Sequence, residues 1–184
     1  MFIVTTRSTV RAVLALACLA AVAGCANVEV WRRPLTVAEP PQPWPRPDMP
    51  GELEVDEILD QLLALHNRAR KEKRRPRLSE SRRLSEAAQA HAEDMAERRK
   101  MTHAGADGST IANRVVARGY KYRRCGENVA VGHYSPELVM RGWLTSAPHR
   151  KNILGGYNQI GLGYATDKDG TPYWCVTFGL PATR

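Results

Sequence analysis

A chain of 184 residues is long enough for one folded domain with a single hydrophobic core. Its 27 Lys and Arg residues against 19 Asp and Glu residues give a formal net charge of +8 at pH 7, which favours anionic partners. Because the N-terminus predicts export, nucleic acid is not expected among these partners, and anionic lipids, lipopolysaccharide or wall polymers fit the charge better.

The N-terminus has the pattern of a secretory signal. Arg7 and Arg11 precede an uncharged run over residues 12–24 that is too short to span a bilayer as a helix. The run ends in small residues before Cys25, and this ending resembles the bacterial lipobox, in which the cysteine receives acyl chains such as palmitate. An ordinary signal peptide with an incidental cysteine is the alternative. We therefore predict a signal peptide over residues 1–24 and a lipid anchor on Cys25.

A proline-rich segment follows the lipid anchor. Seven of the twelve prolines lie in residues 25–52, which show neither helical nor strand periodicity, so this segment is expected to be an extended tether. Ala26 is not the aspartate that retains many lipoproteins at the inner membrane, so the resemblance favours the outer membrane. The folded domain is then expected over residues 53–184, as a monomer anchored to the cell envelope.

Two amphipathic helices are expected at the start of the domain. Apolar residues recur with helical spacing from Ile58 to His66 and again from Leu84 to Met95, and Pro76 separates the two runs. Between them, residues 68–77 hold seven basic side chains and one acidic one. The favoured interpretation of this basic run is a solvated helix end and turn.

Two further helices are expected in the middle of the domain. The first is predicted over residues 109–118, and the following Gly119 is expected to end it. The second begins with Ser135 as its N-cap and Pro136 in its first turn, and it is expected to end near Ser146.

The C-terminal third changes to the two-residue period of β-strands. Over residues 160–166, large side chains alternate with glycine or alanine, so one strand face is nearly bare and lets a helix or a ligand approach closely. Residues 174–178 alternate likewise, and Asp169-Gly170 predicts a tight hairpin between the two strands. Helices followed by an antiparallel hairpin predict an α+β domain.

Cys125 and Cys175 are the cysteines that remain if Cys18 leaves with the signal and Cys25 is acylated. In an oxidising compartment the simple inference is a disulfide between them, which would stabilise the fold by about 4 kcal/mol. Two unpaired buried thiols are the alternative.

Three polar side chains stand where the pattern would otherwise be apolar or a turn: His103, Glu127 and His149. If the segment after Glu127 is extended, its carboxylate shares a face with Val129 and Val131, points inward and requires a partner. Two imidazoles and a carboxylate suit a divalent metal such as zinc, or a general-base site that activates water. A hydrogen-bonded polar cluster that orders a cleft is the alternative.

Five sequence blocks occur in an order that resembles a known family. They are Met101-Thr102-His103, Cys125-Gly126-Glu127-Asn128-Val129-Ala130, the run from Trp143 to Leu154 with its Ser-Ala-Pro-His-Arg-Lys-Asn-Ile-Leu ending, Ile160-Gly161-Leu162-Gly163, and Tyr173-Trp174 with Phe178-Gly179. Together these blocks resemble the CAP superfamily of cysteine-rich secretory, antigen 5 and pathogenesis-related 1 proteins, also called the SCP domain. The likeness covers about residues 55–180 and is strongest toward the bacterial branch.

The resemblance implies an α-β-α sandwich with a central antiparallel sheet, and a cleft in which two histidines and two glutamates bind a divalent cation. Carried over by motif, three of these four residues are His103, Glu127 and His149. The second glutamate is replaced by Ser146, a neighbour of the cleft, so one ligand and one negative charge are missing. The three matching residues would be the metal ligands and, in an enzyme, the catalytic residues.

Three functions remain open from the sequence. A binding module that holds a lipid or an envelope polymer in the His/Glu cleft is favoured, because the missing carboxylate and the lack of a serine or cysteine nucleophile motif weigh against an enzyme. A metal-dependent hydrolase or peptidase that uses His103, Glu127 and His149 is the first alternative. An interaction protein of the envelope with a vestigial cleft is the second.

Overall fold

The computed structural model describes residues 54–183. The predicted signal peptide, the predicted lipid anchor on Cys25 and the predicted tether over residues 25–52 lie outside the described residues. Among the residues that are described, no helix has the length and apolar character needed to cross a membrane.

Nine elements follow one another in the described part of the chain. They are α1 (Val55–Glu72), β1 (Ser79–Glu80), α2 (Arg82–Arg98), α3 (Ile111–Ala117), β2 (Tyr122–Val131), α4 (Pro136–Thr145), α5 (Ala147–Ile153), β3 (Gln159–Thr166) and β4 (Pro172–Pro181). The four helices and two C-terminal strands predicted from the sequence are confirmed, whereas β1 and α5 were not predicted.

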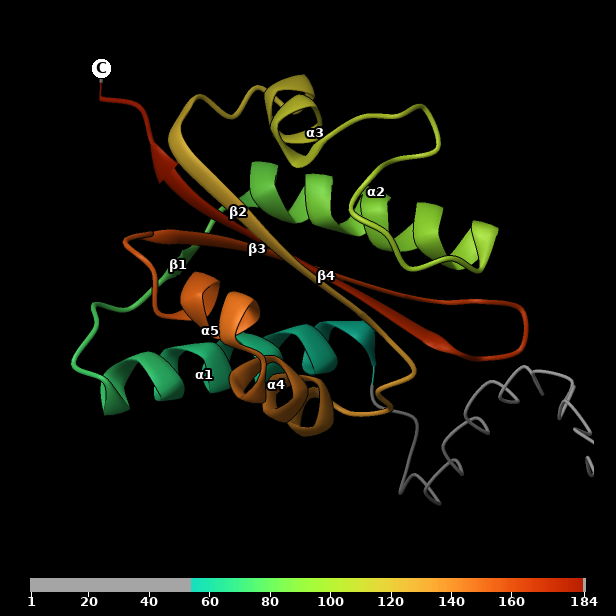
Figure 1. The fold of residues 1–184 in the computed structure, drawn as a ribbon, viewed down its shortest axis with the longest axis horizontal. Coiled ribbons are helices and arrows are strands. Elements are labelled where there is room, and N and C mark those ends of the chain that lie inside the picture. The colour runs from blue at the N-terminus through green and yellow to red at the C-terminus, as the bar shows by residue number, and fades with distance from the viewer. Residues whose placement is uncertain (1–53, 184) are drawn as a thin grey trace, which may run out of the picture. The chain divides into compact units, whose positions relative to one another are not determined.

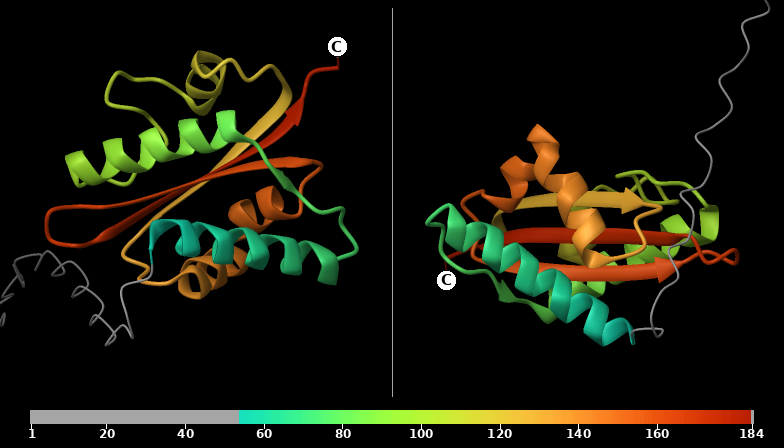
Figure 2. Two further views of the ribbon diagram at one scale, coloured as in Figure 1. Left: turned by 180° about the vertical axis from the view of Figure 1, so that it is seen from behind. Right: turned by 90° about the horizontal axis from the view of Figure 1, so that it is seen from below.

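The strands form one sheet in the order β1-β3-β4-β2. The three long strands are antiparallel to their neighbours, and the short β1 pairs with β3 in parallel. Helices α2 and α3 cover one face of the sheet, and α1, α4 and α5 cover the other (Figure 1 and Figure 2). This arrangement is the predicted α-β-α sandwich.

The helix ends follow the sequence signals. Ser135 caps α4 by accepting a hydrogen bond from the Leu138 backbone N–H, and Pro136 occupies the first turn. Helix α3 begins later than predicted, at Ile111, because Thr110 and Asn113 form a reciprocal capping box.

The bare face of β3 receives helix α2. A Cβ atom at Gly161 would lie 2.0 Å from the Leu84 backbone carbon, and one at Gly163 would lie 2.4 Å from the Ala88 backbone carbon. Of the two partners that the sequence left open, a helix or a ligand, the structure therefore shows the helix.

The predicted disulfide between Cys125 and Cys175 is wrong. Cys125 lies opposite Gly179 in the β2–β4 pairing, whereas Cys175 lies opposite Val129. The two cysteines are thus offset by four residues along neighbouring strands, or roughly 13 Å at about 3.3 Å per residue. A disulfide needs Cα atoms within about 7 Å, and both thiols are free.

Candidate functional site

Glu127 is the buried centre of a polar network on β2, an edge strand of the sheet. Its side chain is 2% exposed, and it shares with Val129 the strand face that packs against α2. The prediction that this carboxylate points inward is confirmed, and it does find partners.

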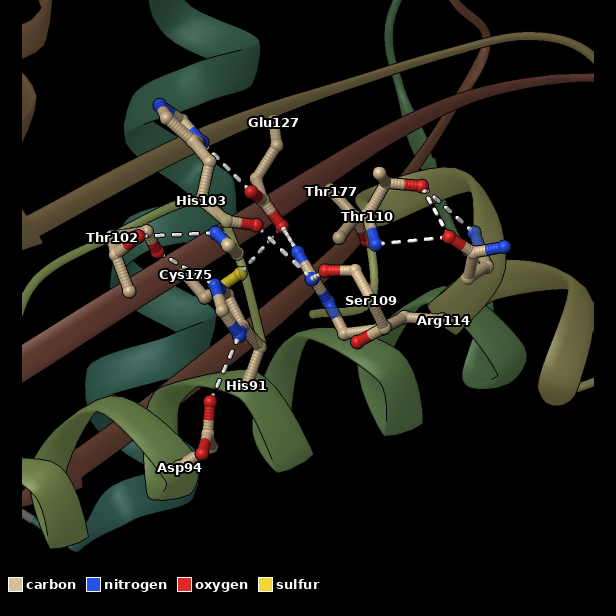
Figure 3. A network of polar contacts seen from close by, with 12 residues as sticks. His91, Asp94, Thr102, His103, Ser109, Thr110, Arg114, Glu127, Cys175 and Thr177 are labelled. Atoms are coloured by element: carbon tan, nitrogen blue, oxygen red, sulfur yellow. Dashed lines mark hydrogen bonds and ion pairs between the residues drawn. The ribbon is translucent and has the colours of Figure 1, made fainter. Parts of the chain in front are cut away.

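Three donors surround the Glu127 carboxylate (Figure 3). The His103 Nδ1 donates to Oε1 at 2.8 Å, and the Arg114 Nη2 donates to Oε2 at 2.5 Å. The Cys175 thiol also points to Oε2, with Sγ at 3.6 Å. Both carboxylate oxygens are therefore occupied by side chains of this chain.

Arg114 ties the loop between α2 and α3 to this carboxylate. Its Nη1 donates to the backbone carbonyl oxygens of His103 at 3.1 Å and Ser109 at 2.9 Å, and its side chain is only 12% exposed. Sequence reasoning missed this residue. The signal that could have identified Arg114 was its position next to Val115, on the inward side of a short amphipathic helix. A guanidinium that is buried there requires an anionic partner.

The contacts of Glu127 shift both its own pKa and that of His103. Burial alone would raise the pKa of Glu127, but the hydrogen bond from His103 and the charge of Arg114 outweigh it and hold that pKa below its ordinary value. The hydrogen bond to Glu127 raises the pKa of His103. The carboxylate thus stays ionised, and the imidazole holds its proton to a higher pH.

His149 reaches the same region from the other helical layer, on α5. Asn152 fixes α5 to β2, because its amide donates to the Glu127 backbone carbonyl and to Asn128 Oδ1, both at 2.9 Å. The Asn128 amide in turn donates to the backbone carbonyl of His149. Burial, and after it the charge of His103, lowers the pKa of His149, so the two imidazoles lie within electrostatic range.

Ser146, predicted as a neighbour of the cleft, is the N-cap residue of α5. Its backbone carbonyl accepts a hydrogen bond from the Arg150 N–H. Within residues 54–183, its side chain makes no hydrogen bond to His103, Glu127 or His149.

His91, on helix α2, contacts the loop that carries His103. It is buried on α2, and its Nε2 bonds to the carbonyl oxygen of Thr102 at 2.8 Å, which fixes the residue next to His103. Its Nδ1 has no hydrogen-bond partner among the described residues and lies 3.7 Å from the Asp94 carboxylate. Burial lowers the pKa of this imidazole, which keeps it neutral as a core residue.

The arrangement presents an oriented imidazole at the surface. The His103 side chain is 63% exposed, and its ring extends away from Glu127 with its second nitrogen on the outer side (Figure 3). A buried carboxylate that holds one ring nitrogen fixes the orientation of the ring and raises its basicity. The outer nitrogen can therefore exchange a hydrogen bond with a polar group or take up a proton.

The donor set does not fit a divalent cation in this arrangement. The guanidinium of Arg114 occupies one oxygen of Glu127 and His103 occupies the other, so a metal at the carboxylate would meet a fixed positive charge. Among residues 54–183, no three His, Cys, Asp or Glu side chains are grouped so that they could hold a metal ion. Zinc binding by His103, Glu127 and His149 stays a prediction.

Comparisons with known proteins agree with this fold. The profile of the cysteine-rich secretory protein family, CAP, matches residues 63–178. The uncharacterized protein YkwD of Bacillus subtilis is 35% identical over 82 residues, which are 44% of this chain and 32% of YkwD. This chain therefore spans about a third of the length of that relative.

Two solved structures share the architecture. An outer surface protein of Borrelia burgdorferi aligns with a TM-score of 0.66 at 22% identity, over 73% of this chain and all of that protein. An extracellular protein of Bacillus anthracis with an SCP domain aligns with a TM-score of 0.59 at 25% identity, over 71% of this chain and 45% of that chain.

Proposed function

Because this chain belongs to the CAP family of cysteine-rich secretory proteins, we propose that it is an exported protein of the cell envelope whose domain is a binding module. The ligand is a lipid or an envelope polymer, bound where His103 and His149 flank the buried Glu127. The anchor is the acylated Cys25, and the outer membrane is its favoured location.

Export is supported from two sides. The N-terminal run before Cys25 has the pattern of a lipoprotein signal. The similar proteins of Borrelia burgdorferi and Bacillus anthracis are described as an outer surface protein and an extracellular protein.

The observation that carries the binding role is that the ionised Glu127 carboxylate is already paired with positive side chains of the same chain. Glu127 is already paired with Arg114 and His103, so the network is complete without a ligand and leaves an exposed imidazole to meet one. Within residues 54–183, no hydroxyl or thiol is hydrogen-bonded to the His103 ring, so the site lacks the nucleophile and base pair of covalent catalysis. Two imidazoles of different basicity suit a polar headgroup that both accepts and donates hydrogen bonds.

The test is to purify the full chain from envelopes in mild detergent and to identify the co-purified molecules by mass spectrometry. We expect one class of lipid or polymer at near-stoichiometric amounts. In the His103→Ala/His149→Ala variant this ligand should fall roughly tenfold or more, because each lost hydrogen bond is worth about 0.5 to 1.5 kcal/mol. A His133→Ala variant, which removes an imidazole from the loop before α4, should retain the ligand.

Two results would contradict the proposal. A ligand retained in full by the double variant would place binding outside this site. Absence of any bound molecule, combined with capture of an envelope protein partner by all variants, would favour an interaction protein with a vestigial cleft.

A hydrolase is the second candidate, and the His103–Glu127 pair favours it, because a carboxylate-oriented imidazole can act as a general base. That function predicts turnover of peptide or ester substrates by the purified chain, lost in His103→Ala. A metal-dependent form also predicts sensitivity to a chelator. No turnover across a broad panel, with and without added zinc, would eliminate this candidate.

A further inference from the structure

A basic hollow lies at the C-terminal end of α1, away from the site described above. It has a volume of about 500 Å³ and is lined by Ala64, Asn67, Arg68, Lys71, Arg74, Arg75 and Arg77. Five of these seven residues are cationic and none is acidic. Glu72, the one acid in this stretch, pairs with Arg68 at 3.4 Å.

A buried arginine holds the loop that carries Arg74, Arg75 and Arg77. Arg70 is 1% exposed, and its guanidinium donates to four backbone carbonyls. These belong to Pro76, Ile153, Gly155 and Tyr157, at 2.7 to 2.9 Å. The loop after α1 is thereby fixed to the segment between α5 and β3, so the hollow is preorganised.

Backbone contacts complete the frame. The Asn67 side chain makes two hydrogen bonds to the backbone of Leu78, one to its N–H and one to its carbonyl. Arg74 adopts the left-handed conformation with φ 53°, and the carbonyl oxygens of Arg70 and Lys71 accept hydrogen bonds from the turn that follows. Because the last carbonyls of α1 are capped in this way, they oppose an incoming anion less than free ones would.

The cations themselves are exposed and available. In the described part of the chain, no hydrogen bond or ion pair engages the side chains of Lys71, Arg74, Arg75 or Arg77. After burial, the positive charge of Arg75 is the next cause that lowers the pKa of Arg70, which reflects the repulsion that the cluster builds up. A bound multivalent anion would reduce the repulsion among these cations. The planar guanidinium of arginine can also bind a phosphate through two parallel hydrogen bonds.

The hollow is separate from the site of the proposed function. The loop after α1 leads into β1 at one edge of the sheet, whereas Glu127 lies on β2 at the opposite edge. The two sites can therefore be tested, and can fail, independently.

We propose that this hollow is a binding site for a ligand with two or more clustered phosphate groups. Its volume falls in the range of about 300 to 1,000 Å³ that holds small ligands, and its lining supplies charge and donors rather than apolar contact. The phosphates can belong to a soluble polyphosphate or to the headgroup of an anionic lipid, and the experiment separates these sources.

Isothermal titration calorimetry with inorganic tripolyphosphate measures the soluble source on the full chain. Co-sedimentation with phosphatidylcholine vesicles, with and without cardiolipin, whose headgroup carries two phosphates, measures the lipid source. The test variant is Arg74→Gln/Arg75→Gln/Arg77→Gln. Its control is Arg118→Gln/Lys121→Gln/Arg123→Gln, which removes the same charge from positions before and at the start of β2.

We expect the test variant to weaken binding roughly tenfold or more and the control to weaken it less than about threefold, because the lost donors are charge-assisted. An Arg-to-Lys version of the test variant keeps the charge and should still bind several-fold more weakly, since lysine cannot form the bidentate contact. If the triple variant does not fold, Lys71→Gln/Arg74→Gln replaces it.

Pocket-dependent binding of tripolyphosphate assigns a soluble phosphate ligand, and pocket-dependent binding of cardiolipin vesicles alone assigns a lipid headgroup. Equal losses in the test and control variants would overturn the site in favour of diffuse charge. Absence of binding to both probes would overturn it as well.

Discussion

The chemistry of the candidate site rests on one buried carboxylate. Glu127 is 2% exposed and keeps its charge because Arg114 and His103 each take one of its oxygens. Removing one partner of a buried ion pair leaves an uncompensated charge, which costs more than the pair contributes. The same contact that orients His103 therefore also holds the loop between α2 and α3.

We expect Arg114→Gln to destabilise the protein by about 3 kcal/mol, because the buried Glu127 carboxylate then loses its guanidinium and keeps only His103 and the weak thiol donor of Cys175. Urea unfolding followed by circular dichroism measures this change. Arg118→Gln, four residues along at an exposed position, is the control and should change stability by less than about 0.5 kcal/mol. Equal stability of the two variants would show that the ion pair is not structurally important.

The buried His66 makes the stability of the fold depend on pH. Burial is the largest cause that lowers the pKa of His66 from 6.5 to about 4, so the folded protein keeps this imidazole neutral while the unfolded chain protonates it. Between these two values the unfolded state binds more protons, and stability falls as the pH falls. The imidazole packs between the rings of Trp143 and Phe178, with centroids 5.9 and 5.8 Å away.

His66→Phe should remove this dependence. From pH 7 to pH 4.5, the loss of unfolding free energy in the variant should be smaller than in the unchanged chain by about 2 to 3 kcal/mol. Urea unfolding at the two pH values gives both differences, and a fixed packing cost of the phenyl ring cancels between them. Parallel pH profiles of the two proteins would refute the assignment.

At the scale of elements, two contacts set where the functional side chains lie. Asn152 fastens α5 to the backbone of β2 beside Glu127 and thereby places His149. Helix α2 lies against β3 at Gly163 so closely that a Cβ atom has no room. This close approach also positions His91 and, through Thr102, the loop that carries His103.

Gly163→Ala should destabilise the fold by about 1 to 3 kcal/mol, since the added methyl meets the α2 backbone, which cannot move as a side chain can. Chemical unfolding measures the loss. Gly156→Ala is the matched control, because the nearest atom to its Cβ, at 3.2 Å, is the end of the flexible Arg124 side chain. A Gly163→Ala variant as stable as this control would mean that α2 can shift to make room for the added methyl group.

At the scale of the whole molecule, the domain is held together without a covalent crosslink between Cys125 and Cys175, because the β2–β4 register keeps them apart. We expect dithiothreitol to leave the melting temperature unchanged. After denaturation without reductant, iodoacetamide should label both cysteines in a peptide map. A melting temperature that drops under reduction, as loss of about 4 kcal/mol would cause, would show that this register is wrong.

Most of the fold could be predicted from periodicity and local signals. The helical spacing in α1 and α2, the Ser135–Pro136 start of α4 and the alternation in β3 and β4 all appear in the structure. These are local properties, decided by neighbours within one or two turns. Short elements such as β1 and α5 carry too few residues to show a period.

The sequence by itself determined the α-β-α architecture, the family likeness and the inward-facing Glu127. Only the tertiary structure decided what meets this carboxylate: Arg114 from α3 and His103 from the loop before it donate hydrogen bonds, and the free thiol of Cys175 points to it as well. The physical reason is that side-chain partners depend on strand register and helix placement. One shift of register changes every partner while leaving the local pattern of the sequence unchanged.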